Sequence, residues 1–158
     1  MSQNELQLIL DCAARLQILD LFGRYCRLID RCAWQDLDRV FTPDVEVDFS
    51  STAAYVKGNA LIQGIGALKE FYETAMSHIG PGVTYFMTGH VIDVQGDTAR
   101  ASCYSQTLSF PYGGYYDTEV RKGPDGWRFS KLTYEWRHFE EVMNRLKNHM
   151  KTEDAKRE

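Results

Sequence analysis

The chain has 158 residues, of which 44% are hydrophobic and 13% aromatic, and its formal net charge at pH 7 is −4. This length and apolar content predict a single domain with one substantial core. The negative charge, with no basic cluster before the C-terminal tail, argues against a nucleic-acid partner, because phosphate binding requires concentrated lysine and arginine. No apolar run approaches the roughly 18 residues that span a bilayer, so we expect no membrane partner and a cytoplasmic protein.

The first part of the chain is predicted to be helical. Residues 5–33 carry apolar side chains at helical spacing, and residues 34–41 predict a short second helix that ends at Pro43. The expected buried stripe of the first helix consists of Leu8, Cys12, Leu16, Leu19, Phe22, Cys26 and Ile29.

A short hairpin and a third helix are expected next. Residues 45–49 alternate as a strand, and residues 55–58 are expected to pair with them. Residues 61–78 predict another amphipathic helix, which the glycine-proline-glycine sequence of residues 80–82 ends.

Beyond this break the hydrophobic period changes to two. Four strands are predicted, over residues 83–94, 98–110, 115–121 and 127–134. Helices followed by a four-stranded meander indicate an α+β fold. We expect residues 1–139 to form a single domain and residues 140–158 a C-terminal helix and charged tail.

Cysteine and histidine spacing does not indicate a metal site. Cys12, Cys26 and Cys32 are separated by 14 and 6 residues, and Cys103 is remote, which fits reduced thiols better than a zinc framework. None of the four histidines has an HExxH-type neighbour. We therefore expect no metal and no cofactor.

An acid near the end of the first predicted helix is the main candidate for chemistry. At about 100° per residue, Asp30 projects within roughly 40° of Leu16 and Leu19, which belong to the expected buried stripe. A carboxylate there is costly unless something pairs with it or uses it. Two structural alternatives stay open, in which Asp30 pairs with an arginine or caps the next helix and Tyr25 is an ordinary core aromatic.

Several short segments, in this order, resemble the SnoaL-like families of the nuclear transport factor 2 superfamily. These segments are residues 25–30 with Trp34 and Leu37, then residues 41–44, 96–99, 115–121 and 125–129. The resemblance implies a cystatin-like cone, in which a curved mixed or antiparallel sheet wraps around a long N-terminal helix and two shorter helices. Members of the group include scytalone dehydratase, bile acid 7α-dehydratase, hexachlorocyclohexane dehydrochlorinase, polyketide cyclases and the β subunits of ring-hydroxylating dioxygenases.

The resemblance also implies a site. In the dehydratases an aspartate at the end of the first helix works with a histidine on the first long strand, and Asp30 matches the aspartate, with Tyr25 one turn earlier. Tyr85 stands where the family has histidine, and strand alternation predicts that Tyr85 and Met87 face the pocket while His90 faces away. A β-bulge would reverse this, so His90 stays an alternative base.

The expected pocket is apolar with few polar anchors. Its candidate substrate-binding residues are Phe49, Tyr55, Met87, Ser105, Tyr116 and Trp136. Such a lining suits a hydrophobic, aromatic or polycyclic small molecule.

We expect a cofactor-independent lyase, with dehydration as the first choice, in which Asp30 moves a proton and Tyr25 and Tyr85 stabilise an oxyanion. One alternative is a polyketide cyclase or ketosteroid-type isomerase, and another is a non-catalytic binding module or dioxygenase β-type subunit. The resemblance further implies a homodimer, paired through the outer sheet face, or a homotrimer.

Overall fold

The computed structural model describes residues 1–53, 60–75, 83–108 and 112–138. Its elements follow one another in the order α1 (Gln3–Asp30), η1 (Trp34–Arg39), β1 (Phe41–Asp48), η2 (Ser50–Thr52), β2 (Leu61–Gln63), α2 (Ile65–Ala75), β3 (Tyr85–Gln95), β4 (Thr98–Thr107), β5 (Tyr112–Gly123) and β6 (Gly126–His138). The predicted C-terminal helix and tail lie outside the described residues.

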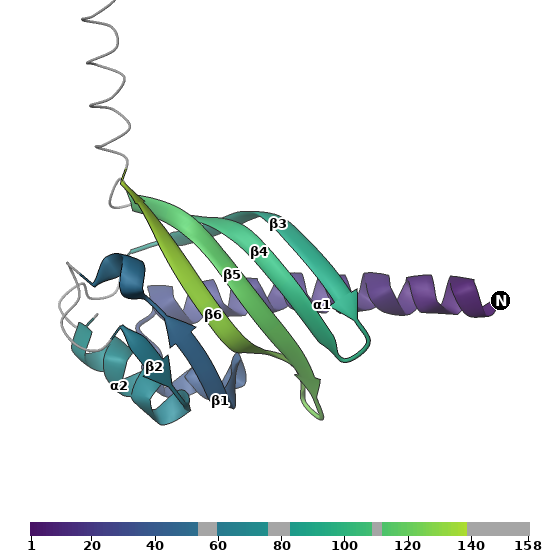
Figure 1. The fold of residues 1–158 in the computed structure, drawn as a ribbon, viewed down its shortest axis with the longest axis horizontal. Coiled ribbons are helices and arrows are strands. Elements are labelled where there is room, and N and C mark those ends of the chain that lie inside the picture. Colours follow the sequence, from purple (N-terminus) through teal and green to yellow (C-terminus); the bar gives the residue numbers. More distant parts are fainter. Residues whose placement is uncertain (54–59, 76–82, 109–111, 139–158) are drawn as a thin grey trace, which may run out of the picture.

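A single six-stranded sheet in the order β2-β1-β6-β5-β4-β3 lies across α1 (Figure 1). Strands β3 to β6 form an antiparallel meander, and β1 joins it by pairing parallel to β6. This mixed sheet over a long N-terminal helix confirms the predicted α+β class. The core lies between α1 and the inner sheet face, where Phe22 packs edge-on against Phe129 with ring centroids 4.9 Å apart. Among the described residues, no helix has both the length and the apolar character that crossing a membrane requires.

The buried face of α1 differs from the predicted stripe. A capping box between Ser2 and Glu5 starts the helix. Its buried residues are Ala14, Ile18, Leu21, Phe22, Tyr25 and Ile29. Leu8, Cys12, Leu16 and Leu19 are exposed instead. The prediction was wrong there because α1 carries two apolar stripes, and its N-terminal turns extend past the edge of the sheet (Figure 1).

Two predicted helices have other bounds than expected within the described residues. The helix predicted for residues 61–78 starts only at Ile65, because residues 61–63 form the edge strand β2, with Ile62 opposite Val47 of β1. Gly64, at φ +83°, makes the bend between strand and helix. The segment of residues 55–58, predicted to pair with β1, lies outside the described residues. The helix predicted for residues 34–41 is the 3-10 helix η1, and Phe41 already begins β1.

Strand β3 contains a β-bulge that the alternation argument could not place. The register with β4 shifts between Thr88 and Val91, and Gly89 there has φ +64°. A Cβ atom on Gly89 would lie 2.8 Å from the ring of Tyr104, so glycine is required for both conformation and space. After the bulge the inward face changes phase, and His90 points inward with Ile92.

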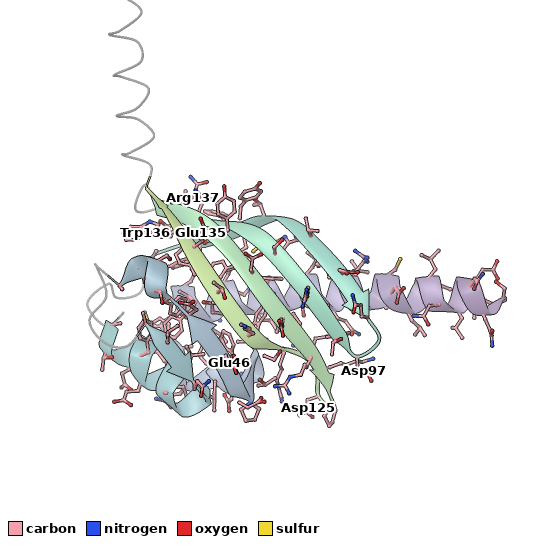
Figure 2. All side chains as sticks on the ribbon, viewed as in Figure 1. Glu46, Asp97, Asp125, Glu135, Trp136 and Arg137 are labelled. Atoms are coloured by element: carbon pink, nitrogen blue, oxygen red, sulfur yellow. The ribbon has the colours of Figure 1, made fainter. Side chains whose placement is uncertain are left out.

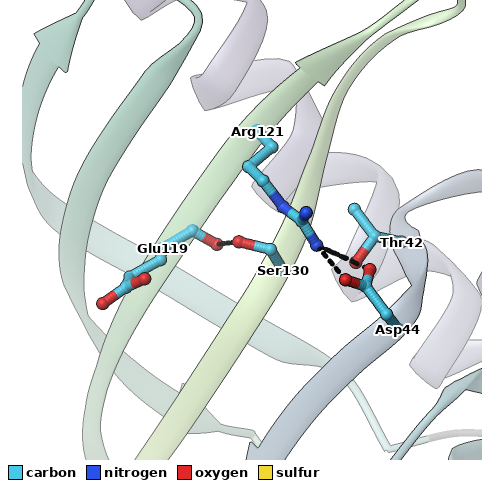
Figure 3. A network of polar contacts seen from close by, with 5 residues as sticks. All are labelled: Thr42, Asp44, Glu119, Arg121 and Ser130. Atoms are coloured by element: carbon cyan, nitrogen blue, oxygen red, sulfur yellow. Dashed lines mark hydrogen bonds and ion pairs between the residues drawn. The ribbon is translucent and has the colours of Figure 1, made fainter.

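Besides its pairing with β6, the parallel strand β1 is linked to the meander by the side chain of Arg121 (Figure 3). Arg121 of β5 reaches over β6 and donates to both carboxylate oxygens of Asp44, at 2.5 and 2.7 Å, and to the Thr42 hydroxyl at 3.4 Å. Hydrogen bonds to Asp44, first from Arg121 and then from the Thr42 side chain, lower the pKa of Asp44 to about 2. Beside them, the Ser130 hydroxyl donates to the Glu119 carbonyl at 3.1 Å, where the β5–β6 register shifts.

Candidate active site

Asp30 joins the end of α1 to the start of β3. It is the last residue of the helix, and its Oδ1 accepts a hydrogen bond from the backbone N–H of Tyr85 at 2.9 Å. The carboxylate is half-buried. This bond holds Asp30 beside the first strand of the meander, where Tyr85 points inward and packs against the core.

Tyr25 lies one turn and a half before Asp30 and is almost completely buried. Its hydroxyl is 2.6 Å from the hydroxyl of Tyr72 on α2, and either oxygen can donate. Tyr72 in turn stacks on Trp34 of η1, with ring centroids 5.0 Å apart. Sequence reasoning missed Tyr72, although its place on the buried face of α2 with Leu68 and Ala75 is a signal that could have found it.

Two further tyrosines come from the inner face of the sheet. Tyr116 of β5 and Tyr134 of β6 lie opposite one another, with ring centroids 4.7 Å apart, and the Tyr116 ring is 6.0 Å from that of Tyr25. Gly114 leaves room for the Tyr134 ring, which lies 2.7 Å from where a Cβ atom would be. We call Tyr25, Tyr72, Tyr85, Tyr116 and Tyr134 the tyrosine cluster.

One member of the cluster, Tyr85, is electrostatically coupled to Asp30. Burial, and then the charge of Asp30, raise the pKa of Tyr85 to about 12. The pKa of Tyr72 is also raised, first by burial and then by neighbouring Tyr85. Burial likewise raises the pKa of the Cys26 thiol to about 11, with the Asp30 charge as the second cause. At neutral pH these groups are therefore protonated donors, and the charge of Asp30 acts on two of them, Tyr85 and Cys26.

Alkaline pH is expected to destabilise the protein through this cluster. An unfolded tyrosine titrates near pH 10, whereas folded Tyr85 titrates near 12, so the stability it contributes is complete below pH 10 and is lost as pH rises through 12. The melting temperature, followed by circular dichroism between pH 9 and 12 together with tyrosinate absorbance, should fall over this range. Tyr85→Phe should make the fall less steep. A melting temperature that stays constant to pH 12 would contradict the expected linkage.

His90 lies inside the protein but apart from Asp30. Its ring packs edge-on against Phe22, at a centroid distance of 4.8 Å, and Phe22 is about two helical turns before Asp30. Burial lowers the pKa of His90, and its Nε2 is buried without a hydrogen-bond partner among the described residues. The bulge thus turns His90 inward without bringing it to the carboxylate. His78, His149 and the side chain of His138 lie outside the described part of the chain.

The predicted substrate-binding residues differ in how close they lie to the tyrosine cluster. Phe49 stacks on Phe71 at 5.2 Å and lies 6.5 Å from Tyr134, so it borders the tyrosine cluster with Tyr116. Met87 packs against the core, and Ser105 is buried on the inner face of β4. Trp136 is half-buried, and its backbone N–H donates to the Ser51 hydroxyl at 3.0 Å. Tyr55 lies outside the described residues.

The outer sheet face carries charged residues, in contrast to the aromatic inner face. Figure 2 shows Asp97 and Asp125 at the turns that end β3 and β5, and Glu135, Trp136 and Arg137 at the opposite end of the sheet. Between these ends, charged residues of alternating sign lie in cross-strand register, in the order Glu46, Lys131, Glu119, Arg100 and Asp93. A hollow of about 620 Å³ is lined by the first four of these residues, Glu46 to Arg100. Within the described ranges, no three or more His, Cys, Asp or Glu side chains gather as a metal site would require.

Comparisons with known proteins agree with this architecture. An uncharacterized protein from Mycobacterium tuberculosis is 28% identical over 145 residues, which is 85% of this chain and 92% of that protein. A protein from Novosphingobium aromaticivorans, described as NTF2-like with a cystatin-like fold, superimposes with a TM-score of 0.67 at 22% identity, covering 85% of this chain and 89% of the other. A candidate scytalone dehydratase from the same organism gives a TM-score of 0.63 at 18% identity, covering 82% and 86%.

These similarities to solved structures show the fold, while the family follows from the sequence. The family model of the SnoaL-like domain matches residues 11–133, a span that contains Tyr25, Asp30, Tyr85 and all of the four-stranded meander except the end of β6. The chain belongs to the SnoaL-like domain family.

Proposed function

We propose that this protein is a cofactor-independent lyase or isomerase that moves a proton with Asp30 and stabilises an oxyanion with tyrosine hydroxyls. The observation that supports the proposal is the hydrogen bond from the Tyr85 backbone N–H to Asp30, which holds this carboxylate beside the one member of the tyrosine cluster whose pKa its charge raises. The SnoaL-like and NTF2-like group includes dehydratases, isomerases and cyclases, which agrees with acid–base chemistry.

The two kinds of group divide the chemical work. A carboxylate can accept a carbon-bound proton, and phenols with raised pKa values stay protonated and donate to an oxygen that gains negative charge. Tyr72 acts through Tyr25, since their hydroxyls share one hydrogen bond. In the proposed chemistry Asp30 takes up the proton and the tyrosine hydroxyls stabilise the oxyanion. It therefore requires no cofactor.

The substrate class follows from the surroundings of the cluster. Phe49, Phe71 and Trp34 supply aromatic surface around the phenols, and Asp30 is the carboxylate whose charge acts on Tyr85. We infer an uncharged or weakly acidic hydrophobic ring compound, with dehydration as the first choice of reaction.

A generic elimination substrate tests the proposal. In 5-nitrobenzisoxazole a base removes the ring C–H proton and the N–O bond breaks. The ring opens to a single product that carries a nitrile and a coloured phenolate. The protein should catalyse this saturably without added metal or cofactor. Tyr25→Phe should lower the rate about 10²-fold and Tyr72→Phe less, about tenfold. The exposed Tyr104→Phe is the matched control. Elimination no faster than with an equal concentration of acetate would contradict the proposal.

A second candidate function is a non-catalytic binding module or β-type subunit. The position of His90 favours it, because this histidine packs on Phe22 and not beside Asp30. Calorimetric binding of 5-nitrobenzisoxazole without elimination would support this function over catalysis.

A further inference from the structure

A serine hydroxyl continues the sheet beyond the end of β1. The parallel pairing of β1 with β6 ends at Asp48 and Thr133, whereas β6 runs further. Beyond that point the Ser51 hydroxyl donates to the Tyr134 carbonyl at 2.6 Å and accepts the Trp136 backbone N–H at 3.0 Å. A residue in a parallel ladder likewise donates to one carbonyl of the neighbouring strand and accepts the N–H two residues further on. The Ser51 side chain therefore takes the place of one backbone residue of β1.

These two hydrogen bonds, which we call the Ser51 bridge, tie η2 to the sheet (Figure 1). The other hydrogen bonds of η2 stay within its own segment. The Thr52 N–H and hydroxyl both donate to the Phe49 carbonyl, each at 2.8 Å, and the Ser50 N–H donates to Asp48 Oδ1 at 2.8 Å. Among the described residues, the side-chain hydrogen bonds that join η2 to β6 are therefore those of Ser51.

The residue just before η2 forms a wall of the tyrosine cluster. The Phe49 ring stacks on Phe71 at 5.2 Å and lies edge-on to Tyr72 at 6.1 Å and to Tyr134 at 6.5 Å. Phe49 and Tyr134 come from segments that the β1–β6 ladder no longer joins at this level. The Ser51 bridge spans them, because it binds the helix that follows Phe49 to the backbone carbonyl of Tyr134 itself.

We propose that Ser51 is a positioning residue for substrate binding, whose two hydrogen bonds hold the Phe49 wall in place against Tyr134. This inference rests on the proposed function, in which a hydrophobic ring compound binds beside the tyrosine cluster. The proton-transfer end is held separately, by the hydrogen bond from the Tyr85 N–H to Asp30. Loss of the Ser51 hydroxyl should therefore weaken binding of the ring and spare the chemical step.

Ser51→Ala tests this division with 5-nitrobenzisoxazole as the substrate. KM should rise about tenfold while kcat changes less than about twofold, because the bridge acts equally on the bound ground state and the transition state. Ser51 is exposed, so the substitution removes no core packing, and circular dichroism of the same samples checks the fold.

Two further variants separate the hydroxyl from the position. Ser51→Thr keeps a hydroxyl and should restore the KM of the unaltered protein. Ser50→Ala is the matched control, because Ser50 is also exposed and its hydroxyl makes no hydrogen bond among the described residues. An unchanged KM in Ser51→Ala would overturn the proposal, as would a rise in KM that Ser51→Thr does not reverse. So would a loss confined to kcat.

Binding distinguishes a failure of this inference from a failure of the proposed catalysis. If the unaltered protein eliminates no faster than acetate, the catalytic proposal fails, and the dissociation constant of 5-nitrobenzisoxazole from calorimetry takes the place of KM. That constant should also rise about tenfold in Ser51→Ala and return in Ser51→Thr. Equal affinity in the three proteins, or no binding to the unaltered protein, would overturn the role of Ser51.

Discussion

Asp30→Asn is expected to lower the elimination rate of 5-nitrobenzisoxazole about 10²- to 10⁴-fold and to leave the fold intact. Asparagine keeps an oxygen that can accept the Tyr85 N–H, so the bond between α1 and β3 survives. The amide cannot take up a proton at neutral pH, so the base is lost. Initial rates, with circular dichroism and melting temperature measured on the same samples, check both halves of this expectation.

Asp20→Asn is the matched control for Asp30. Asp20 lies on the same helix but is exposed and pairs with Arg24, so its replacement should change neither rate nor melting temperature by much. Asp30→Ala adds a second comparison, because it removes the acceptor of the Tyr85 N–H and should lower stability by about 1 kcal/mol more than asparagine does. Full activity in Asp30→Asn would remove this carboxylate from the mechanism.

Gly114→Ala is expected to destabilise the protein by about 3 kcal/mol or more. A Cβ atom there would lie 2.3 Å from the Glu135 carbonyl oxygen and 2.7 Å from the Tyr134 ring. The first of these neighbours is backbone of the paired strand, so β5 and β6 would have to separate locally. Urea unfolding followed by tryptophan fluorescence measures the loss.

Gly123→Ala, at the other end of β5, provides the comparison. Its Cβ would lie 3.9 Å from the nearest heavy atom, the Gly126 carbonyl oxygen, which is ordinary contact. The expected change is within about 1 kcal/mol, since alanine also restricts the unfolded chain. Equal stability of the two variants would show that the close approach at Gly114 is relieved at little cost.

The order of elements and the fold class could be predicted because they depend on local signals. The period-two strands after residue 83 and the turns at Gly96 and Gly126 correspond to the meander of β3 to β6. The family resemblance supplied the cone and is confirmed by the match over residues 11–133. The place of the edge strand β2 was missed, because three residues before a helix carry too short a pattern to separate strand from helix.

The site was harder to predict than the fold. Asp30, Tyr25 and Tyr85 were named as candidates mainly from family positions, since the helical argument for Asp30 relied on Leu16 and Leu19 being buried, and both are exposed. Tyr72 was missed because its importance depends on a contact of 2.6 Å with a residue 47 positions earlier. The buried face of α1 was misjudged because both of its stripes have helical spacing, and only tertiary packing decides between them.

The bulge at Gly89 divides β3 into two halves that can change independently. Residues before it set the phase of Tyr85 and Met87 beside Asp30, while residues after it set the phase of His90 and Ile92 beside Phe22. Deleting one residue at the bulge would turn the second half over and leave the first unchanged. Substitutions in one half therefore leave the side-chain directions of the other half unchanged. We expect relatives to differ in the residue at the Tyr85 position while keeping the packing beyond Gly89.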